Sequence, residues 1–169
     1  MSIDFNFQPH KGVTINANQE SLKIEALICF PLYASAKAMI ASYKQFLDKY
    51  NLTFTQYLTM IVLWENESLR VKDLGNILHL DSGTLTPLLK KLTAKGYINR
   101  EHGLRDEREV FLTLTESGAN LKEDLKDIPH KVASYLKISD DEFKILFSLL
   151  YKILHNLEFS MSKHPLNPA

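Results

Sequence analysis

The chain of 169 residues has a single cysteine and carries no long run of apolar residues. One cysteine cannot form an internal disulfide framework, and such scarcity is typical of proteins of a reducing cytosol. Because a membrane-spanning helix needs about 18 consecutive apolar residues, no transmembrane segment is expected. The first twelve residues also lack the basic and then apolar layout of a signal peptide. We therefore expect a cytoplasmic protein that has no membrane partner.

Patterns typical of catalysis or metal binding are equally scarce. No Ser/His/Asp arrangement and no paired carboxylates stand out, and Cys29 lacks the Thr-x-x-Cys setting of peroxidatic thiols. Four histidines are available to a metal sensor, but none pair at ligand spacing: His79, His102, His130 and His155. We expect no metal, no cofactor and no enzymatic activity. A one-cysteine thiol peroxidase that uses Cys29 remains the enzymatic alternative.

The formal net charge is zero, with 20 Lys and Arg against 20 Asp and Glu, but the charge is uneven. Between Arg70 and Arg108, eight basic residues stand against five acidic ones, an excess of three positive charges. A local basic segment on a neutral chain suits a regulator that must release non-specific DNA easily. The hydrophobic content of 45% is enough for a core and argues against disorder.

The segment from Val71 to Gly96 predicts two amphipathic helices joined by a short polar turn. The first helix is expected over Val71–Leu78 and the second over Ser82–Lys95, with Gly96 as its stop. The second has leucines at the i, i+3, i+4 and i+7 positions of one face, namely Leu85, Leu88, Leu89 and Leu92. This arrangement is typical of a helix-turn-helix motif.

The residues after this motif predict a β-hairpin. Tyr97–Arg100 is strand-like, and alternating apolar residues over Val110–Leu114 indicate a second strand. The charged loop Glu101–Arg108 lies between them. A helix-turn-helix followed by a hairpin with a basic tip is a winged helix, which indicates DNA binding. The alternative is a small helical domain with a solvated hairpin.

The rest of the chain predicts helices on both sides of this module. Residues 1–20 are expected to be a flexible arm, and 21–50 a helical region in which Pro31 either kinks the helix or begins a new one. Residues 53–128 form the predicted winged helix-turn-helix DNA-binding domain, opened by a capping box at Thr53. Residues 130–158 carry a wide apolar stripe after a second capping box at Ser139. The expected fold class is mainly α with a small β-hairpin wing.

Regions 21–50 and 130–158 need partners for their apolar faces, so we interpret them as dimerisation helices. A homodimer would bind a pseudo-palindromic double-stranded operator whose half-sites lie about 34 Å apart. On the predicted second helix, four residues on the face opposite the leucines can reach the major groove: Ser82, Thr84, Thr86 and Lys90. Hydroxyl groups near a helix N-terminus can also serve phosphate.

Three segments resemble the MarR family of winged-helix regulators: Asp81–Leu92, Asp106–Arg108 and Leu114–Gly118. Leu27–Ala34 and Lys49–Tyr57 resemble its OhrR branch, whose repressors sense organic hydroperoxides through one cysteine. The similarity covers about residues 22–157. It implies a dimeric repressor that leaves its operator when its cysteine is oxidised. A repressor switched by an aromatic or anionic small molecule is the alternative.

The resemblance assigns roles to individual residues of the wing. Arg108 corresponds to the arginine that enters the minor groove, and Asp106 to the acidic residue that braces it. Arg100 and Arg105 are interpreted as contacts to the DNA backbone. The alternative for each of these charged side chains is a solvated surface position.

Composition alone makes Cys29 a small buried hydrophobic residue, whereas the resemblance makes it the redox sensor. A sensor needs a thiolate, which the N–H groups of a helix beginning at Pro31 or the Tyr33 hydroxyl would stabilise. Tyr43 lies about 21 Å from Cys29 along a straight helix. The resemblance implies that Tyr43 reaches the partner's thiolate. Phe54 stands where that branch usually has another tyrosine.

Overall fold

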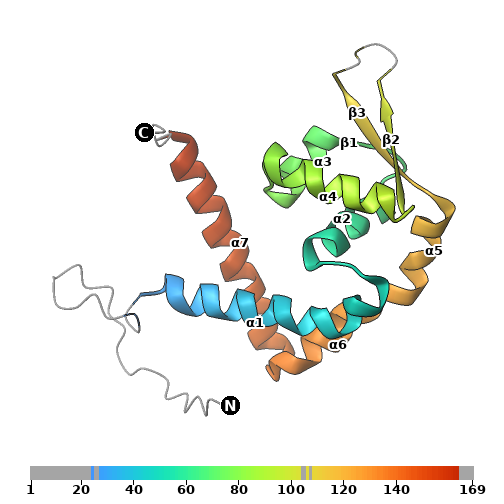
Figure 1. Cartoon of the computed structure of the whole chain (residues 1–169). Coiled ribbons are helices and arrows are strands. Elements are labelled where there is room, and N and C mark those ends of the chain that lie inside the picture. The colour runs from blue at the N-terminus through green and yellow to red at the C-terminus, as the bar shows by residue number, and fades with distance from the viewer. Residues whose placement is uncertain (1–23, 25–26, 104–105, 107, 164–169) are drawn as a thin grey trace. The chain divides into compact units, whose positions relative to one another are not determined.

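The computed structural model describes residues 24, 27–103, 106 and 108–163. It divides into two compact units, one ending at Asn120 and one beginning at Leu121. In chain order the elements are α1 (Cys29–Leu47), the 3₁₀-helix η2 (Asp48–Tyr50), α2 (Phe54–Trp64), β1 (Leu69–Arg70), α3 (Val71–Leu78), α4 (Ser82–Ala94), β2 (Ile98–His102), β3 (Val110–Leu114), α5 (Glu116–Leu125), α6 (Ile128–Ala133), the 3₁₀-helix η3 (Ser134–Leu136) and α7 (Asp140–Lys163) (Figure 1). None of the described helices is both long and apolar enough to cross a membrane.

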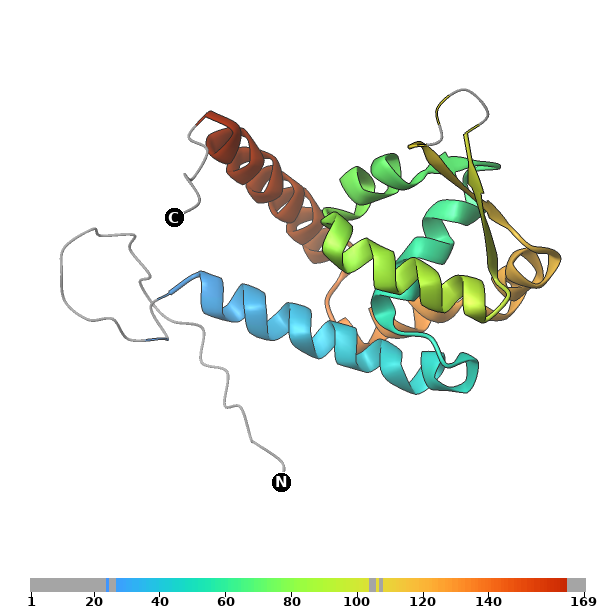
Figure 2. The same cartoon turned by 45° about the horizontal axis from the view of Figure 1, so that its top comes forward.

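Helices α2, α3 and α4 pack together, and a small antiparallel sheet lies against them in the order β1-β3-β2. The hairpin of β2 and β3 runs from Ile98 opposite Leu114 to His102 opposite Val110 and projects beyond the helices as a wing (Figures 1 and 2). The predicted fold class, mainly α with a hairpin wing, is therefore confirmed. The third strand, β1, was not expected from the sequence.

The core of the first unit is built from the predicted leucine stripe of α4. Its four leucines are all buried, and α4 packs against α2 and β2, whose buried side chains include Tyr57, Met60, Leu63 and Ile98. Removing each leucine side chain from water stabilises the fold by about 1.5–3 kcal/mol. The same burial leaves the opposite face of α4 in solvent.

The ends of these helices follow the capping rules. Thr53 forms the expected capping box with Gln56 at the start of α2, and the Asp81 carboxylate accepts a hydrogen bond from the Thr84 amide at the start of α4. Gly96 follows α4 with φ of +72°, a conformation that glycine adopts without steric cost. The predicted α3 and α4 are thus confirmed to within one residue.

Helix α1 begins at Cys29, two residues before Pro31, and continues to Leu47. The reading of Pro31 as the first helical position was therefore wrong, and the alternative reading as a kink stays a prediction. Pro31 is the third residue of the helix, where its missing N–H has no intrahelical acceptor to lose. Residues 21–23, where the helical pattern was expected to begin, lie outside the described residues.

The second unit contains α6 and α7. Pro129 is the second residue of α6, and the break from α5 falls just before that helix. Ser139 and Glu142 form the expected capping box, in which the Ser139 amide donates to Glu142 over 2.8 Å. Eleven large apolar side chains of α7 are exposed, from Phe143 to Phe159. Three of them form an aromatic row, in which Phe143 stacks on Phe147 and the Tyr151 ring is tilted against Phe147. In the single chain this helix therefore presents an extensive apolar surface.

The base of the wing meets the start of α5 at Gly118. A Cβ atom placed there would lie 2.0 Å from the Tyr97 carbonyl oxygen. The Trp64 indole donates to the Gly118 carbonyl over 2.9 Å, and the Gly118 amide donates to the Thr115 hydroxyl over 3.0 Å. Trp64 is thus a half-buried packing residue, as its spacing indicated.

We expect Gly118→Ala to lower the free energy of unfolding by roughly 2–3 kcal/mol or more, because its methyl group has no space beside Tyr97. Gly96→Ala is the matched control, since a Cβ there meets nothing within 4 Å and only the positive φ is strained, at about 1–2 kcal/mol. Urea unfolding of both variants measures the difference. Equal losses would show that the contact at Gly118 relaxes without cost.

Candidate functional site

The outward face of α4 carries the four residues predicted to reach DNA: Ser82, Thr84, Thr86 and Lys90. All four are exposed, opposite the buried leucine stripe. The Thr86 hydroxyl donates to the Ser82 carbonyl over 2.8 Å, and the Thr84 hydroxyl donates to the Asp81 carboxylate over 3.2 Å. Their oxygen atoms remain available as acceptors.

The N-terminus of α4 is occupied by an acidic side chain. Asp81 accepts from both the amide and the hydroxyl of Thr84, and these hydrogen bonds hold the pKa of its carboxyl below the usual range. Free amides at a helix N-terminus attract phosphate, but a carboxylate in their place repels it. The hydroxyl groups of this turn are therefore poorly placed for phosphate, and the bases are the better partner.

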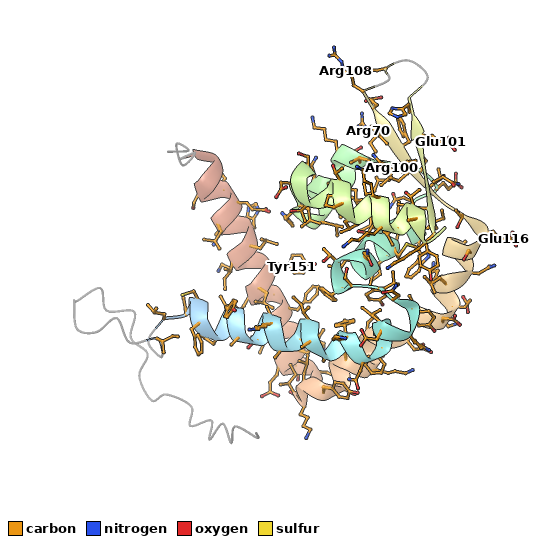
Figure 3. The ribbon with its side chains drawn as sticks, viewed as in Figure 1. Arg70, Arg100, Glu101, Arg108, Glu116 and Tyr151 are labelled. Atoms are coloured by element: carbon orange, nitrogen blue, oxygen red, sulfur yellow. The ribbon has the colours of Figure 1, made fainter. Side chains whose placement is uncertain are left out.

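The wing carries Arg100 on β2 and Arg108 close to its tip (Figure 3). The Asp106 carboxylate accepts a hydrogen bond from the backbone amide of Arg108 over 2.9 Å. The predicted bracing of Arg108 is thus made through its backbone, and its exposed guanidinium extends from the tip. Gly103 permits this tight turn, because a Cβ there would lie 2.8 Å from the Asp106 carbonyl oxygen. Arg105 lies outside the described residues.

Arg70 joins the wing to the helix-turn-helix. Its Nε lies 2.8 Å from the Asp73 carboxylate of α3, and its Nη1 lies 3.0 Å from the Glu109 carboxylate beside Arg108. Hydrogen bonds to these two carboxylates, Asp73 first, raise the pKa of Arg70. The pairs are exposed, so their contribution to stability is small, but they connect α3 to the residue that precedes β3.

A groove of about 510 Å³ lies between the wing and the helices α3 and α4. Its wall includes four basic side chains, Arg70, Lys72, Arg100 and Arg108, together with Ser82 and Thr86 of α4. The structure thereby brings four of the eight predicted DNA-contact residues, Ser82, Thr86, Arg100 and Arg108, into one concave surface. Lys90 lies on the same exposed face of α4 but does not line the groove.

Sequence reasoning did not single out Arg70 and Lys72. Both counted toward the positive charge of the segment, but a two-residue strand such as β1 is too short to show a period of two. The signal that was available is the position of Lys72 on α3, where it lies on the face opposite the buried Leu74.

Cys29 is the first residue of α1 and is exposed in the single chain. The reading as a buried hydrophobic residue was therefore wrong for this chain. The first turn provides few amide donors for the sulfur, because the Phe30 amide donates to the Leu27 carbonyl over 3.0 Å and Pro31 has none. Leu27 and Ile28 beside it are exposed as well. The cysteine thus lies on an open apolar surface.

Two tyrosines were expected to serve the thiolate. Tyr33 is exposed, and the Lys37 ammonium lies 5.9 Å from the centre of its ring. The structure describes no hydrogen bond between Tyr33 and Cys29, which are both among the described residues. Tyr33 therefore remains a candidate donor only by its position one turn along α1.

Tyr43 lies 14 residues along the continuous helix α1, about 21 Å from its own cysteine. Its ring centre is 4.8 Å from that of Phe54 and 5.8 Å from that of Tyr57, and burial raises the pKa of its hydroxyl. Burial and the neighbouring Tyr43 also raise the pKa of Tyr57 to about 12. Both tyrosines are protonated donors at neutral pH.

Comparison with known proteins identifies relatives for most of the chain. The SarA/Rot family of transcriptional regulators matches residues 41–125. An organic hydroperoxide resistance transcriptional regulator of Bacillus subtilis is 47% identical, over 82% of this chain and 94% of that protein. The regulator SarZ of Staphylococcus haemolyticus is 42% identical, over 81% of this chain and 92% of that protein.

The fold is also shared with solved structures of AbfR, a protein of Staphylococcus epidermidis. Reduced AbfR bound to DNA superposes with a TM-score of 0.66 at 32% identity, over 77% of this chain and 91% of that one. AbfR has been solved in an overoxidized DNA-bound form and in a disulfide form as well. With these relatives and the winged helix of residues 53–120, the chain belongs to the MarR-like SarA/Rot family of winged-helix transcriptional regulators.

Proposed function

We propose that this regulator is a dimeric, sequence-specific DNA-binding repressor that organic hydroperoxide releases from its operator by oxidising Cys29. The observation that carries the proposal is the combination of two surfaces in one chain. One is the groove between the wing and α4, with four basic side chains on its wall. The other is a single exposed cysteine at the start of α1, in a chain 47% identical to an organic hydroperoxide resistance regulator.

DNA binding is supported by how charge and shape combine at the first surface. The exposed side of α4 fits the major groove, which admits one α-helix, and the wing then lies beside the adjacent minor groove. Arg108 at the wing tip is the candidate for the minor groove, with Arg100 and Lys72 at the DNA backbone. A relative of 32% identity has been solved on DNA.

Dimerisation is supported by the exposed apolar side chains of the terminal helices. Helix α7 and the first turns of α1 carry large apolar residues that water surrounds in the single chain. Exposed apolar surface on this scale is typical of a protein–protein interface. A second copy of the chain is the partner that gives two reading helices and a pseudo-palindromic operator.

The redox step follows ordinary thiol chemistry. The Cys29 thiolate attacks the terminal oxygen of the hydroperoxide, so that an S–O bond forms, the O–O bond breaks and an alcohol leaves with one proton. Sulfur is oxidised and the peroxide is reduced. The sulfenic acid then condenses with a small cellular thiol, giving a mixed disulfide and water, because the chain has no second cysteine.

A contact within the first unit offers a route from α1 to α4. The half-buried Lys95, just after α4, donates to the carbonyl of Asn51 and to the Gln56 side chain, the latter over 3.0 Å. Asn51 follows directly on α1 and η2. A polar adduct at Cys29 that displaces α1 would therefore shift the end of the reading helix.

A repressor switched by a small molecule is the second candidate. The observation that favours it is a groove of about 410 Å³ between the end of α1 and the start of α2. Its wall includes apolar residues such as Ile40, Leu47, Leu52 and Phe54, and an anionic group would compete with Asp48 for the Lys44 ammonium, 2.5 Å from that carboxylate.

Arg108→Ala should weaken operator binding at least fivefold and lower the slope of log affinity against log salt by about 1, since one cation is lost. Thermal stability should stay unchanged because the guanidinium is exposed. Lys131→Ala, which removes an exposed cation outside the wing, is the control. Fluorescence anisotropy at several salt concentrations measures both. Unchanged affinity for Arg108→Ala would remove it from the interface.

Cys29→Ser should bind the operator as the native chain does but remain bound when an organic hydroperoxide is added. The reason is that serine cannot be oxidised to a sulfenic acid. A gel shift with and without peroxide, followed by mass spectrometry of Cys29, is the measurement. Release of Cys29→Ser by an aromatic acid but not by peroxide would favour the small-molecule switch.

Mixed dimers test whether Tyr43 serves the thiolate of the other chain. In a dimer of Cys29→Ser with Tyr43→Phe, the remaining cysteine faces an intact Tyr43 of the other chain and should oxidise at the native rate. In a dimer of the native chain with the double variant, the remaining cysteine faces a ring that has lost its hydroxyl and should oxidise more slowly. Quenched-flow trapping of the thiol gives both rates. The opposite order would mean that Tyr43 acts within its own chain.

A further inference from the structure

Two hydroxyl groups of α4, those of Thr84 and Thr86, already donate within the protein. Thr86 donates to the Ser82 carbonyl over 2.8 Å, and Thr84 donates to the Asp81 carboxylate over 3.2 Å. A hydroxyl has one proton, so both side chains present only acceptor lone pairs and a γ-methyl group to a ligand. Both residues are exposed, so these groups are open to a DNA groove.

A third apolar group lies on the same turn. Pro87 is inside α4 and is exposed, and its ring replaces the amide N–H that any other residue would have. Pro87 is three residues from Thr84, so the two side chains are neighbours on the helix surface. Thr84, Thr86 and Pro87 thus offer methyl and methylene groups rather than donors, and the donor hydroxyl of this end of α4 is that of Ser82.

The hydrogen-bonding groups of the bases in the major groove determine which base pair the surface of Thr84, Thr86 and Pro87 can recognise. Guanine presents two acceptors in the major groove, so it needs a donor. Thymine presents a 5-methyl group, which apolar contacts recognise, and its partner adenine presents an N6 amino donor. An acceptor-only hydroxyl beside a methyl group is therefore complementary to an A·T pair and not to guanine.

On the proposed DNA-binding function, we propose that α4 selects A·T pairs by packing the γ-methyl of Thr86 and the ring of Pro87 against thymine 5-methyl groups. The oxygens of Thr84 and Thr86 accept from adenine N6. The Asp81 carboxylate keeps the Thr84 hydroxyl oxygen an acceptor toward DNA, since it accepts hydrogen bonds from both the amide and the hydroxyl of that residue. Lys90, one turn beyond Thr86, is the donor that completes the interface.

The test starts from an operator selected with the native full-length chain from random duplexes. Each thymine is then replaced in turn by deoxyuridine, which removes only the 5-methyl group and keeps base pairing. We expect at least one position per half-site to lose about fourfold in affinity, the effect of burying one methyl group. Thymines outside the footprint of α4 serve as the DNA control.

Two variants separate the methyl group from the hydroxyl. Thr86→Ser keeps the hydroxyl and loses the methyl, so it should bind thymine and deoxyuridine operators equally at the sensitive position. Thr86→Val keeps a methyl and loses the hydroxyl, so it should retain the fourfold preference for thymine. Thr93→Ser, at an exposed position near the far end of the same helix, is the matched control and should behave like the native chain.

The outcomes that overturn the inference differ from those that overturn DNA binding itself. If selection yields no preferred duplex, the proposed function fails. If a preferred duplex exists but deoxyuridine has no effect at any position, only the thymine reading fails. A tenfold loss for Thr86→Val at a guanine position, with Thr86→Ser silent, would show that the hydroxyl leaves Ser82 and reads guanine.

Discussion

The orientation of the wing depends on the approach of α5 to the Tyr97 carbonyl, which only a residue without a side chain at position 118 permits. Four hydrogen bonds close this junction. The Thr115 hydroxyl and amide donate to the carbonyls of Gly96 and Tyr97, the Gly118 amide donates to the Thr115 hydroxyl, and the Trp64 indole donates to the Gly118 carbonyl. The first strand of the wing therefore begins, and its second strand ends, against the helical core. The angle between α4 and the wing, on which the proposed contact with two DNA grooves depends, follows from this packing.

Helices α3 and α4 could be predicted because local signals agreed with each other. The leucine spacing, the Asp81 cap and the Gly96 stop all indicated the same boundaries. Strand β1 could not be predicted, because its two residues are paired only through β3, which lies some forty residues further along the chain. Its register depends on tertiary packing rather than on any local pattern.

The candidate site also has one part that the sequence predicts and another part that it does not. The exposed face of α4 follows from its buried face, so its DNA-contact candidates could be read from spacing alone. The ion pairs of Arg70 with Asp73 and Glu109 join two segments far apart in sequence. Whether the hydroxyls of Thr84 and Thr86 donate within the protein depends on their side-chain rotamers. Neither the ion pairs nor these hydrogen bonds can be predicted from the sequence. For Cys29, the first turn of α1 offers few amide donors, so the hydroxyls of Tyr33 and of Tyr43 in a second chain are the proposed donors to its sulfur.

The wing has a consequence for how this regulator can diverge from its relatives. Its strands pair over five residue positions, and the register is complete at His102 and Val110, before the tip begins. Replacing residues in the tip therefore leaves the core, the reading helix and the junction at Gly118 in place. Selection can therefore change the proposed minor-groove contact of the tip one residue at a time while the fold stays intact. Among relatives that share α4, differences in operator preference are expected to accumulate in this loop first.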